Sequence, residues 1–215
     1  YEMTSSLVGS EMCIRDRITR VNEEQKNVLA ALAEILKMRA NIYERGIDKI
    51  SANSRMLAIS LQFSPKFDKE ISSAFVDKIE TASLLHDIGM LSVNDAVAYK
   101  DTNLTADELE GIRRHTVVGA DYLQKINTDK NKNGYLEMAV EIAKYHHENC
   151  DGTGYPEGLS GTDIPLSARI VAVIDTFMAL NSERSYRDAY TREESVEIIK
   201  LSLIHISEPT RLDVI

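Results

Sequence analysis

The sequence predicts an all-α fold in which one domain forms a single helical bundle. Three observations carry this prediction. Apolar residues recur at helical spacing along almost the whole middle of the chain. Two capping boxes, Thr105 with Glu108 and Thr191 with Glu194, mark helix starts. Runs of alternating polar and apolar residues bounded by turn signals, which would indicate strands, do not occur, and there is no internal repeat.

The first three predicted helices each present one apolar stripe to the bundle. They cover residues 25–40, 50–61 and 71–85. In chain order the stripes consist of Val28, Leu32, Ile35 and Leu36; of Ile50, Leu57 and Leu61; and of Phe75, Ile79, Ala82 and Leu85. Because apolar side chains at this spacing share one face of a helix, we expect these residues to form the core.

The remaining predicted helices cover residues 106–126, 136–147, 166–180 and 192–201. The first and the last of them begin at the two capping boxes. The helix over 166–180 is apolar almost throughout, so we expect it near the centre of the bundle. A polar connector over 127–134 and a loop over 151–165 rich in glycine and proline separate these helices.

Composition excludes several classes of protein. The chain has 215 residues, 43% of them apolar and 27% charged, which is typical of a folded soluble domain rather than of a disordered chain. Its net charge of −9 argues against a nucleic-acid partner, and no apolar run approaches the length of a membrane span. Cys13 and Cys150 form no disulfide framework, and neither end resembles a secretory signal, so we expect a reducing, cytoplasmic location.

The two ends of the chain are set apart from this domain. The stretches "SLVGSEMCIRDR" and "LSLIHISEPTRLDVI" resemble translated sequencing-adapter read-through. We therefore expect residues 1–17 and 202–215 to be artefactual or disordered tails and residues 18–201 to be the domain. Pro209 ends any helix that enters the last stretch, and His205 within it receives no functional role.

Ionisable side chains fall on or beside the predicted apolar stripes. They are His86, Asp87, His115, His146, His147 and Asp175. Taken singly, each such residue is more often a hydrogen-bonded core histidine, a helix cap or half of an ion pair than a metal ligand. Taken together, they place many ionisable groups in one core, which a bound cation compensates. Imidazole nitrogens and carboxylate oxygens suit iron, manganese or zinc.

Four motifs resemble the HD-GYP family of metal-dependent phosphohydrolases. They read "HDIG", "RRHTVVGADYL", "YHHENCDGTGYPEGLSGTDIPLSARIVAVIDTFMAL" and "SERSYRDAY", and the similarity spans about Ala31 to Lys200. The resemblance implies an all-α domain of the HD type that holds two or three metal ions, usually iron or manganese, and hydrolyses cyclic di-GMP. On the matching positions it implies that the six residues named above are ligands and that Asp87 bridges two ions.

The resemblance also implies roles in substrate binding and catalysis. Two ions activate a water that attacks phosphorus, with Asp87 as the catalytic bridge and with Arg184 and Arg187 on the substrate phosphate. The loop that gives the family its name consists here of Asp151, Gly152, Gly154, Tyr155 and Pro156. Tyr155 either stacks on a guanine or packs the loop onto the bundle, and the sequence leaves both roles open. An upstream receiver or sensor domain, common in the family, is the implied partner.

The sequence departs from the family pattern at four positions. Met90 stands where a lysine is usual, Ile42 and Gly46 stand where a glutamate and a histidine supply ligands, and Met178 replaces a common aspartate. These departures make a third ion improbable and leave two hypotheses. The first is an active cyclic di-GMP phosphodiesterase with a dinuclear site. The second is a catalytically degenerate domain that binds the nucleotide and acts as a signalling or interaction module.

Overall fold

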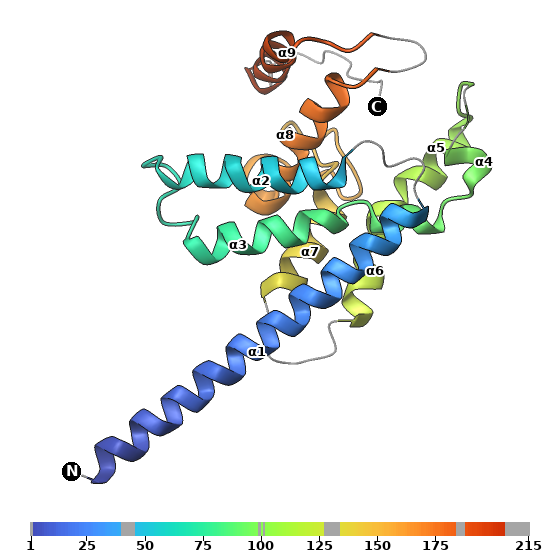
Figure 1. The fold of residues 1–215 in the computed structure, drawn as a ribbon. Helices are drawn as coiled ribbons and strands as arrows, with labels where there is room; N and C mark the ends of the chain where they lie inside the picture. The colour runs from blue at the N-terminus through green and yellow to red at the C-terminus, as the bar shows by residue number, and fades with distance from the viewer. Residues whose placement is uncertain are drawn as a thin grey trace.

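The computed structural model describes residues 2–39, 46–98, 100, 102–126, 134–183 and 188–204 (Figure 1). Within these residues the chain is helical and has no strand; an isolated bridge between Asp151 and Ser160 is the one β-type pairing among them. The all-α prediction is therefore confirmed. The α-helices are α1 (Glu2–Arg39), α2 (Ile47–Gln62), α3 (Ser73–Ala82), α4 (Asp95–Ala98), α5 (Ala106–Arg113), α6 (His115–Ile126), α7 (Gly134–Tyr145), α8 (Leu166–Leu180) and α9 (Arg192–Ile204). The 3-10 helices are η2 (Ser83–Leu85), η3 (Ile88–Ser92) and η4 (Gly161–Asp163).

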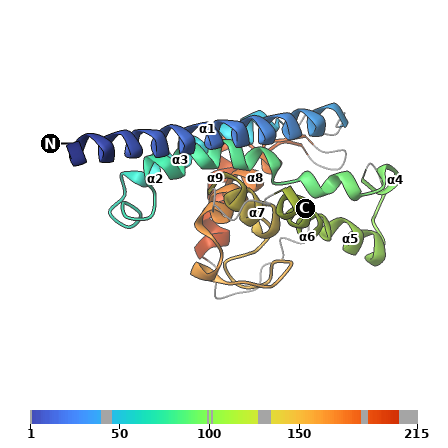
Figure 2. The same ribbon diagram turned by 90° about the horizontal axis from the view of Figure 1, so that it is seen from below.

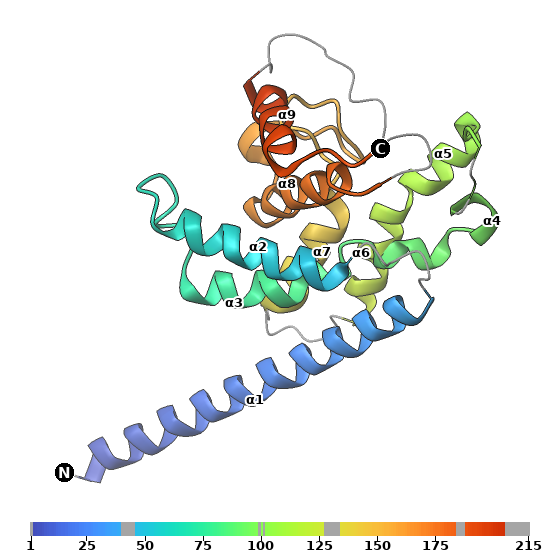
Figure 3. The same cartoon turned by 45° about the horizontal axis from the view of Figure 1, so that its top comes forward.

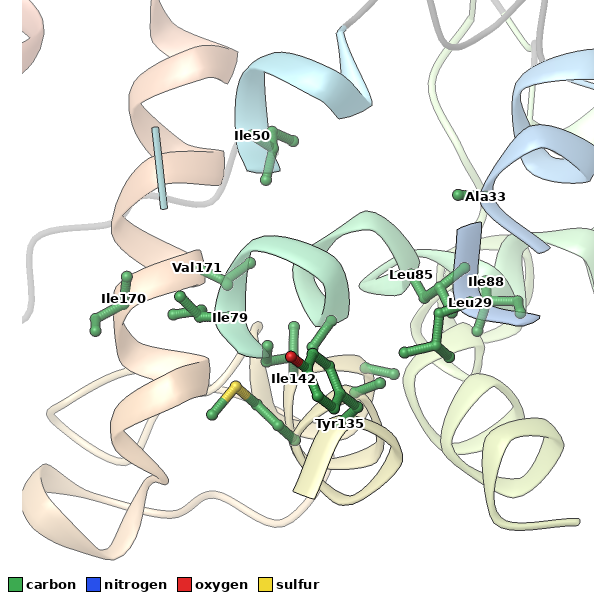
Figure 4. Packing of buried hydrophobic residues seen from close by; sticks show 14 of the residues in the cluster. Leu29, Ala33, Ile50, Ile79, Leu85, Ile88, Tyr135, Ile142, Ile170 and Val171 are labelled. Carbon is green, nitrogen blue, oxygen red and sulfur yellow. The ribbon is translucent and has the colours of Figure 1, made fainter. Parts of the chain in front are cut away.

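The helices α3 and α7 occupy the middle of the bundle. Contacts join α7 to α6, α3, α8 and α1, and they join α2 to both α3 and α8. Figure 4 shows Ile79 of α3, Ile142 of α7 and Val171 of α8 meeting in the core, and all three side chains are buried. The helix α9 lies against α8 at one end of the molecule (Figure 3). This packing brings the ends of η2, α6 and α7 together, which positions the site described below.

Both predicted capping boxes are present. The Thr105 hydroxyl accepts a hydrogen bond from the amide of Glu108, and the Glu108 carboxylate accepts one from the amide of Thr105. Thr191 and Glu194 make the same reciprocal pair at the start of α9. Because each box satisfies amide groups that have no partner inside the helix, both helices begin where the sequence predicts.

The predicted helix over 106–126 is two helices, which corrects the sequence analysis. The helix is interrupted at Arg114, a turn residue between α5 and α6. Nδ1 of His115 bonds the carbonyl oxygen of Ile112, and the hydroxyl of Thr116 bonds that of Arg113. Side chains that occupy these carbonyls compete with the backbone ladder of a continuous helix. The break places His115 at the first position of α6.

Two further boundaries differ from the prediction. The helix predicted over 71–85 is divided into α3 and η2. The helix predicted over 136–147 ends at Tyr145, so that His146 and His147 follow it in a turn. Most of the predicted polar connector over 127–134 lies outside the described residues.

The first helix is longer than predicted. We expected it to begin at residue 25 after a tail, whereas α1 begins at Glu2 and continues unbroken to Arg39. Its first half projects away from the bundle (Figure 1), and Met12 and Ile18 are 63% and 57% exposed. Packing on the bundle is evident from Leu29 onward, where side chains become buried. The artefactual origin of residues 1–17 and 202–215 stays a prediction.

The core stripe of α1 also differs from the prediction. The buried residues are Leu29, Ala33 and Leu36, whereas Val28 and Ile35 are 44% and 53% exposed. Of the predicted stripe, Leu36 alone is fully buried. The predicted stripe mixed residues from two faces of the helix, because neighbouring positions such as 35 and 36 point about 100° apart.

No helix in the described parts of the chain combines the length and the apolar character needed to cross a membrane. Cys13 and Cys150 are both free, as the sequence predicts.

Candidate metal centre

The side chain of Asp87 lies at the centre of a group of histidines. Asp87 precedes η3, His86 separates it from η2, His115 opens α6, and His146 directly follows α7. Oδ1 of Asp87 lies 3.3 Å from Nε2 of His115 and 3.5 Å from Nε2 of His146. Oδ2 lies 3.5 Å from Nε2 of His86. The two carboxylate oxygens therefore face different histidines.

The three imidazole rings are oriented by the backbone behind them. Nδ1 of His86 and of His115 lies 2.9 Å and 2.6 Å from the carbonyl oxygen three residues earlier, and Nδ1 of His146 lies 2.9 Å from the carbonyl oxygen four residues earlier. Because a carbonyl oxygen can only accept, each Nδ1 carries the proton. The Nε2 atom of the neutral ring then presents its lone pair toward Asp87, as in metal-binding histidines.

These lone pairs need a positive charge between them. Nε2 of His115 and Nε2 of His146 lie 3.5 Å apart, so two neutral rings would face each other with lone pairs alone. Donor atoms of Asp87, His115, His146 and His147 all lie within 4.8 Å of one another. Three imidazole nitrogens and one carboxylate oxygen form a set of ligands that divalent transition metals favour. The residues present therefore fit a divalent cation.

The electrostatics of the cluster agree with this conclusion. Burial opposes ionisation of Asp87, but the charge of His86 and the hydrogen bonds of His115 and His146 outweigh it and hold the pKa of Asp87 well below its usual range. Burial also opposes a charge on His115, yet the hydrogen bond to Asp87 and its charge raise the pKa of His115. Burial lowers the pKa of His146, and burial together with the charge of His146 lowers that of His147 further. The cluster thus offers an ionised carboxylate, and the lowered pKa values of His146 and His147 favour their neutral, metal-binding form.

Close packing of two glycines sets the distance between Asp87 and His115. A side chain at Gly89 would overlap the carbonyl group of His115, and a Cβ at Gly119 would lie 2.9 Å from the amide nitrogen of Gly89. The backbone of η3 therefore rests directly on the backbone of α6. This contact brings the carboxylate at position 87 within reach of the imidazole at position 115.

The loop after α7 covers one side of the cluster. The ring of Tyr155 stacks on that of His147 with centroids 4.9 Å apart, and its amide donates a hydrogen bond to the His147 carbonyl oxygen. The guanidinium of Arg113 lies over the Tyr155 ring, 5.3 Å from its centroid. Of the two roles left open for Tyr155, packing of the loop is the one that these contacts support.

A buried carboxylate anchors this loop. Glu148 is 4% exposed and accepts hydrogen bonds from the backbone amides of residues 157, 158 and 159, at 2.7 Å, 3.1 Å and 2.9 Å. Gly154 lies so close to the end of α7 that a Cβ there would overlap backbone atoms of residues 147–149. Gly152 has a φ of 79°, in the left-handed region that glycine tolerates. The loop is thus fixed at two places, where Gly154 packs on the end of α7 and where the amides of residues 157–159 bind Glu148.

The other loop residues named from the sequence have local roles in this structure. Asp151 accepts hydrogen bonds from the amide and the hydroxyl of Thr153, at 3.0 Å and 2.6 Å, and these bonds lower its pKa. Pro156 follows Tyr155 through a cis peptide bond. Asp151 is exposed and does not belong to the histidine cluster.

Asp175 approaches the cluster from α8. It is half-buried, and its negative charge contributes to the raised pKa of both His115 and Tyr155. The structure brings Asp87 together with His86, His115, His146 and His147, and Asp87, His115, His146 and His147 form the tightest group. That Asp175 is a ligand stays a prediction. Arg184, Arg187 and Ile42 lie outside the described residues.

The structure includes three of the four positions that depart from the family pattern. Met90 is a half-buried residue of η3. Met178 packs against the hydrophobic core and its sulfur lies 3.6 Å from Nδ2 of Asn53. Gly46 precedes α2 with φ 75° and ψ 59°, a left-handed conformation. A histidine at position 46 would have to adopt that conformation, which costs about 1–2 kcal/mol.

Sequence reasoning missed two residues of this site, Glu148 and Arg113. Glu148 follows two histidines in "HHENC", and its burial depends on loop amides nine to eleven residues later. The signal available in the sequence was an acidic residue placed directly before a loop rich in glycine. Arg113 belongs to a pair of arginines before His115, and the ring that it covers is more than forty residues away in the chain.

Comparisons with known proteins identify the family. The model of the HD domain matches residues 67–203, which include every described residue of the cluster. The chain belongs to the HD domain family, as an HD-GYP protein. Its fold matches that of Bd1817, an HDG"Y"P protein from Bdellovibrio bacteriovorus, with a TM-score of 0.53 and 19% identity over 90% of this chain and 64% of that one.

Curated relatives are similar over much of this HD-GYP chain. It is 32% identical to the cyclic di-GMP phosphodiesterase response regulator RpfG of Xanthomonas campestris, over 91% of this chain and 48% of the relative. It is 39% identical to a cyclic di-GMP phosphodiesterase of Thermotoga maritima, over 60% of this chain and 34% of the relative. It is also 39% identical to the 3'3'-cGAMP-specific phosphodiesterase 2 of Vibrio cholerae, over 58% of this chain and 23% of the relative. The chain spans half or less of the length of these relatives.

Proposed function

We propose that this HD-GYP domain is a phosphodiesterase that hydrolyses cyclic di-GMP at a centre of two divalent metal ions. The observation that carries the proposal is the orientation of Asp87, whose Oδ1 faces His115 and His146 while its Oδ2 faces His86. A carboxylate that turns its two oxygens toward different imidazoles is suited to bridging two cations.

The ligands divide into two sets on this proposal. Oδ1 of Asp87, with His115, His146 and His147, would hold one ion. Oδ2 of Asp87, with His86 and Asp175, would hold the second. Nitrogen and oxygen ligands without a thiolate favour iron or manganese. The support for the first set is the mutual proximity of its donor atoms, and the support for the second is the position of His86 and the charge that Asp175 exerts on the cluster.

The residues of the chain orient the reaction. Bound divalent ions supply the acidity that allows a water to attack phosphorus near neutral pH. The carbonyl oxygens behind His86, His115 and His146 keep their Nε2 atoms turned toward the reacting centre. Tyr155 covers His147, which keeps bulk water from that side of the ring.

Cationic side chains complete the proposed site. Arg113 is exposed at the rim of the cluster, and a guanidinium there is suited to bind a substrate phosphate through two hydrogen bonds. This residue takes over part of the role of the lysine that Met90 replaces. Arg184 and Arg187 are proposed to hold the second phosphate of the dinucleotide.

The relatives guide the choice of substrate and partner. Several curated relatives are cyclic di-GMP phosphodiesterases, and others act on 3'3'-cGAMP, so both cyclic dinucleotides are the substrates to compare. Because the chain spans 48% of a relative named as a response regulator, we also propose that a receiver or sensor domain regulates this domain in the whole protein.

A second candidate is a domain that binds the dinucleotide without hydrolysing it. The observations that favour it are Met90 in η3, where the cationic side chain is missing, and Met178, whose side chain is engaged with Asn53 and the core. Such a domain would signal through its bound nucleotide.

Metal analysis of anaerobically purified protein, combined with a turnover assay on both dinucleotides, tests the proposal. We expect about two ions per chain after loading with manganese or iron, and hydrolysis of cyclic di-GMP. Asp87→Asn removes the bridging charge and should abolish turnover and most metal binding, whereas Asp163→Asn, at an exposed position of η4, should change neither. Full metal content with bound but unhydrolysed nucleotide would favour the second candidate. A rise in turnover in Met90→Lys would then show that the missing cationic side chain at position 90 limits hydrolysis. Metal-free protein after loading would contradict the proposed phosphodiesterase.

A further inference from the structure

His147 is held differently from the other three histidines of the cluster. In His86, His115 and His146 the Nδ1 atom bonds a backbone carbonyl oxygen three or four residues earlier. His147 lies two positions beyond the end of α7, in a turn, and among the described residues none hydrogen-bonds a nitrogen of its ring. Other contacts must therefore fix the rotation of this ring if it is to present a nitrogen to a cation.

Contacts with aromatic rings replace the missing hydrogen bond. The ring of Tyr155 is stacked on that of His147, with 25° between the planes and 4.9 Å between the centroids. The ring of His115 meets His147 edge-on at 5.1 Å, and that of His146 lies 4.1 Å away with a tilt of 43°. Of these three neighbours, Tyr155 alone comes from outside the ligand set.

We propose that Tyr155 is a positioning residue that orients the imidazole of His147 for the metal, as the carbonyl oxygens do for the other three rings. The proposal rests on the proposed function, in which His147 is a ligand. Offset stacking of two flat rings restricts their rotation, so the nitrogen of His147 is directed before a cation arrives. Ligands that are already oriented bind a metal more tightly than ligands that must first be ordered.

The backbone fixes the position of Tyr155 relative to His147. The amide of Tyr155 donates a hydrogen bond of 3.1 Å to the carbonyl oxygen of His147, and a Cβ at Gly154 would lie 2.5 Å from the same oxygen. Figure 2 shows the loop between α7 and α8 on the side of the bundle opposite α1. Because the two rings are carried by backbone segments in direct contact, the stack is built into the fold of this loop.

The aromatic face of Tyr155, rather than its hydroxyl group, performs this role. Stacking on His147 uses the face of the ring, and so does the attraction of the Arg113 guanidinium, which lies 5.3 Å from the ring centroid. A phenylalanine at position 155 preserves both contacts. A leucine there is apolar and of similar bulk but has no aromatic face. The two substitutions are therefore expected to differ.

Calorimetric titration of the metal-free full chain with manganese tests the proposal. We expect Tyr155→Leu to raise the apparent dissociation constant for manganese about 10-fold, whereas Tyr155→Phe should stay close to the parent. The metal content after loading with excess manganese should stay full, because Asp87 and the other histidines remain. Tyr122→Leu, at a position of α6 that is 37% exposed, is the matched control and should leave the dissociation constant unchanged.

A double-mutant cycle separates the orientation of His147 from a general role of Tyr155 in loop packing. In a His147→Ala background there is no ring to orient, so Tyr155→Leu should raise the dissociation constant no further. A further rise of the same size would overturn the proposal. A dissociation constant for Tyr155→Leu equal to that of the parent, or an equal rise in Tyr155→Phe, would also overturn it.

Proton NMR of the metal-free protein gives a measurement that does not depend on metal binding. The ring current of Tyr155 should shift the carbon-bound ring protons of His147, which are identified by their loss in His147→Ala. We expect this shift to persist in Tyr155→Phe and to disappear in Tyr155→Leu. Parent protein that binds no manganese would contradict the proposed function, whereas His147 signals unchanged by Tyr155→Leu would overturn this inference. Circular dichroism checks that each variant keeps its helix content.

Discussion

Backbone carbonyl groups within one helical turn of His86, His115 and His146 fix the rotation and the protonation of each imidazole ring. The lone pairs are therefore directed before a cation binds, which lowers the entropy that binding must overcome. Asp87 could not supply this order alone, since a carboxylate orients neighbouring rings only through charge and hydrogen bonds. The residue-scale conclusion is that local hydrogen bonds organise the metal centre.

Glu148 leads to a prediction at the same scale. Glu148→Ala leaves the amides of residues 157, 158 and 159 without their acceptor, so we expect a loss of about 2–4 kcal/mol in the free energy of unfolding. The loop that carries Tyr155 should also lose its position over His147, and turnover should fall while metal content stays near that of the parent. Denaturant unfolding and metal analysis measure these effects.

Two variants control this prediction. Glu148→Gln keeps one acceptor oxygen and should lie between the parent and the alanine variant. Glu157→Ala removes an exposed carboxylate from the same loop and should cost much less. Equal stability of Glu148→Ala and the parent protein would show that the loop does not depend on this anchor.

At the scale of elements, the site depends on how η3 meets α6. The contact between Gly89 and Gly119 brings two backbones together, with no side chain to adjust the distance. The break between α5 and α6 is equally important, because it places His115 at the start of α6, where its Nδ1 bonds the carbonyl oxygen of Ile112. Short elements and their junctions, rather than long helices, set the geometry of the cluster.

Gly89→Ala tests the contact between η3 and α6. The new methyl group would overlap the carbonyl of His115, so the two elements must separate. We expect a loss of about 3 kcal/mol in the free energy of unfolding. We also expect weaker metal binding, because the carboxylate of Asp87 moves away from the imidazole of His115. Gly111→Ala is the control, because a Cβ at position 111 meets nothing within 4 Å. Unchanged metal affinity in Gly89→Ala would refute this account of the spacing.

The capping box of α5 predicts a dependence of stability on pH. The hydrogen bonds of Glu108 to Lys100 and to Thr105 lower the pKa of its carboxyl group from the ordinary value of 4.5. A carboxyl whose pKa is lower in the folded state stabilises the fold above its unfolded pKa, and this contribution is lost as pH falls through the folded pKa.

The variant Glu108→Gln isolates that contribution. It should melt below the parent protein at pH 7, and the difference between the two should shrink as the pH falls below about 4.5. Thermal melts at several pH values give the comparison. A difference that stays constant over this range would mean that the charge of Glu108 contributes nothing.

At the scale of the whole molecule, α1 joins two parts of different character. Its second half completes the core through Leu29, Ala33 and Leu36, and its first half projects into solvent. The two halves contribute unequally to stability, since burial of apolar surface is the main favourable contribution to folding. The bundle is therefore complete without the beginning of the helix.

Deletion of residues 1–17 should leave the thermal stability almost unchanged. Side chains described near the end of this segment, such as Met12, are exposed, so the deletion removes little buried surface. Melting of the shortened and full chains gives the test, and a large drop would show that the first half of α1 packs on the bundle.

Local patterns predicted much of this molecule. The helix over 166–180 has the predicted bounds, and both capping boxes form, because helix periodicity and caps depend on residues within a few positions of one another. The histidines and aspartates of the cluster were also evident, since ionisable groups on apolar stripes stand out in a sequence. Their roles as ligands and those of Arg184 and Arg187 stay predictions.

Long-range packing determined the rest. The sequence contains two apolar stripes on α1, and only the position of the bundle shows that Leu29 is buried while Val28 is exposed. The three amides that bind Glu148 and the guanidinium over Tyr155 come from segments that the fold brings together. Local spacing defines which side chains share a face, but burial depends on which neighbour covers that face, and that information is not contained in any one segment of the chain.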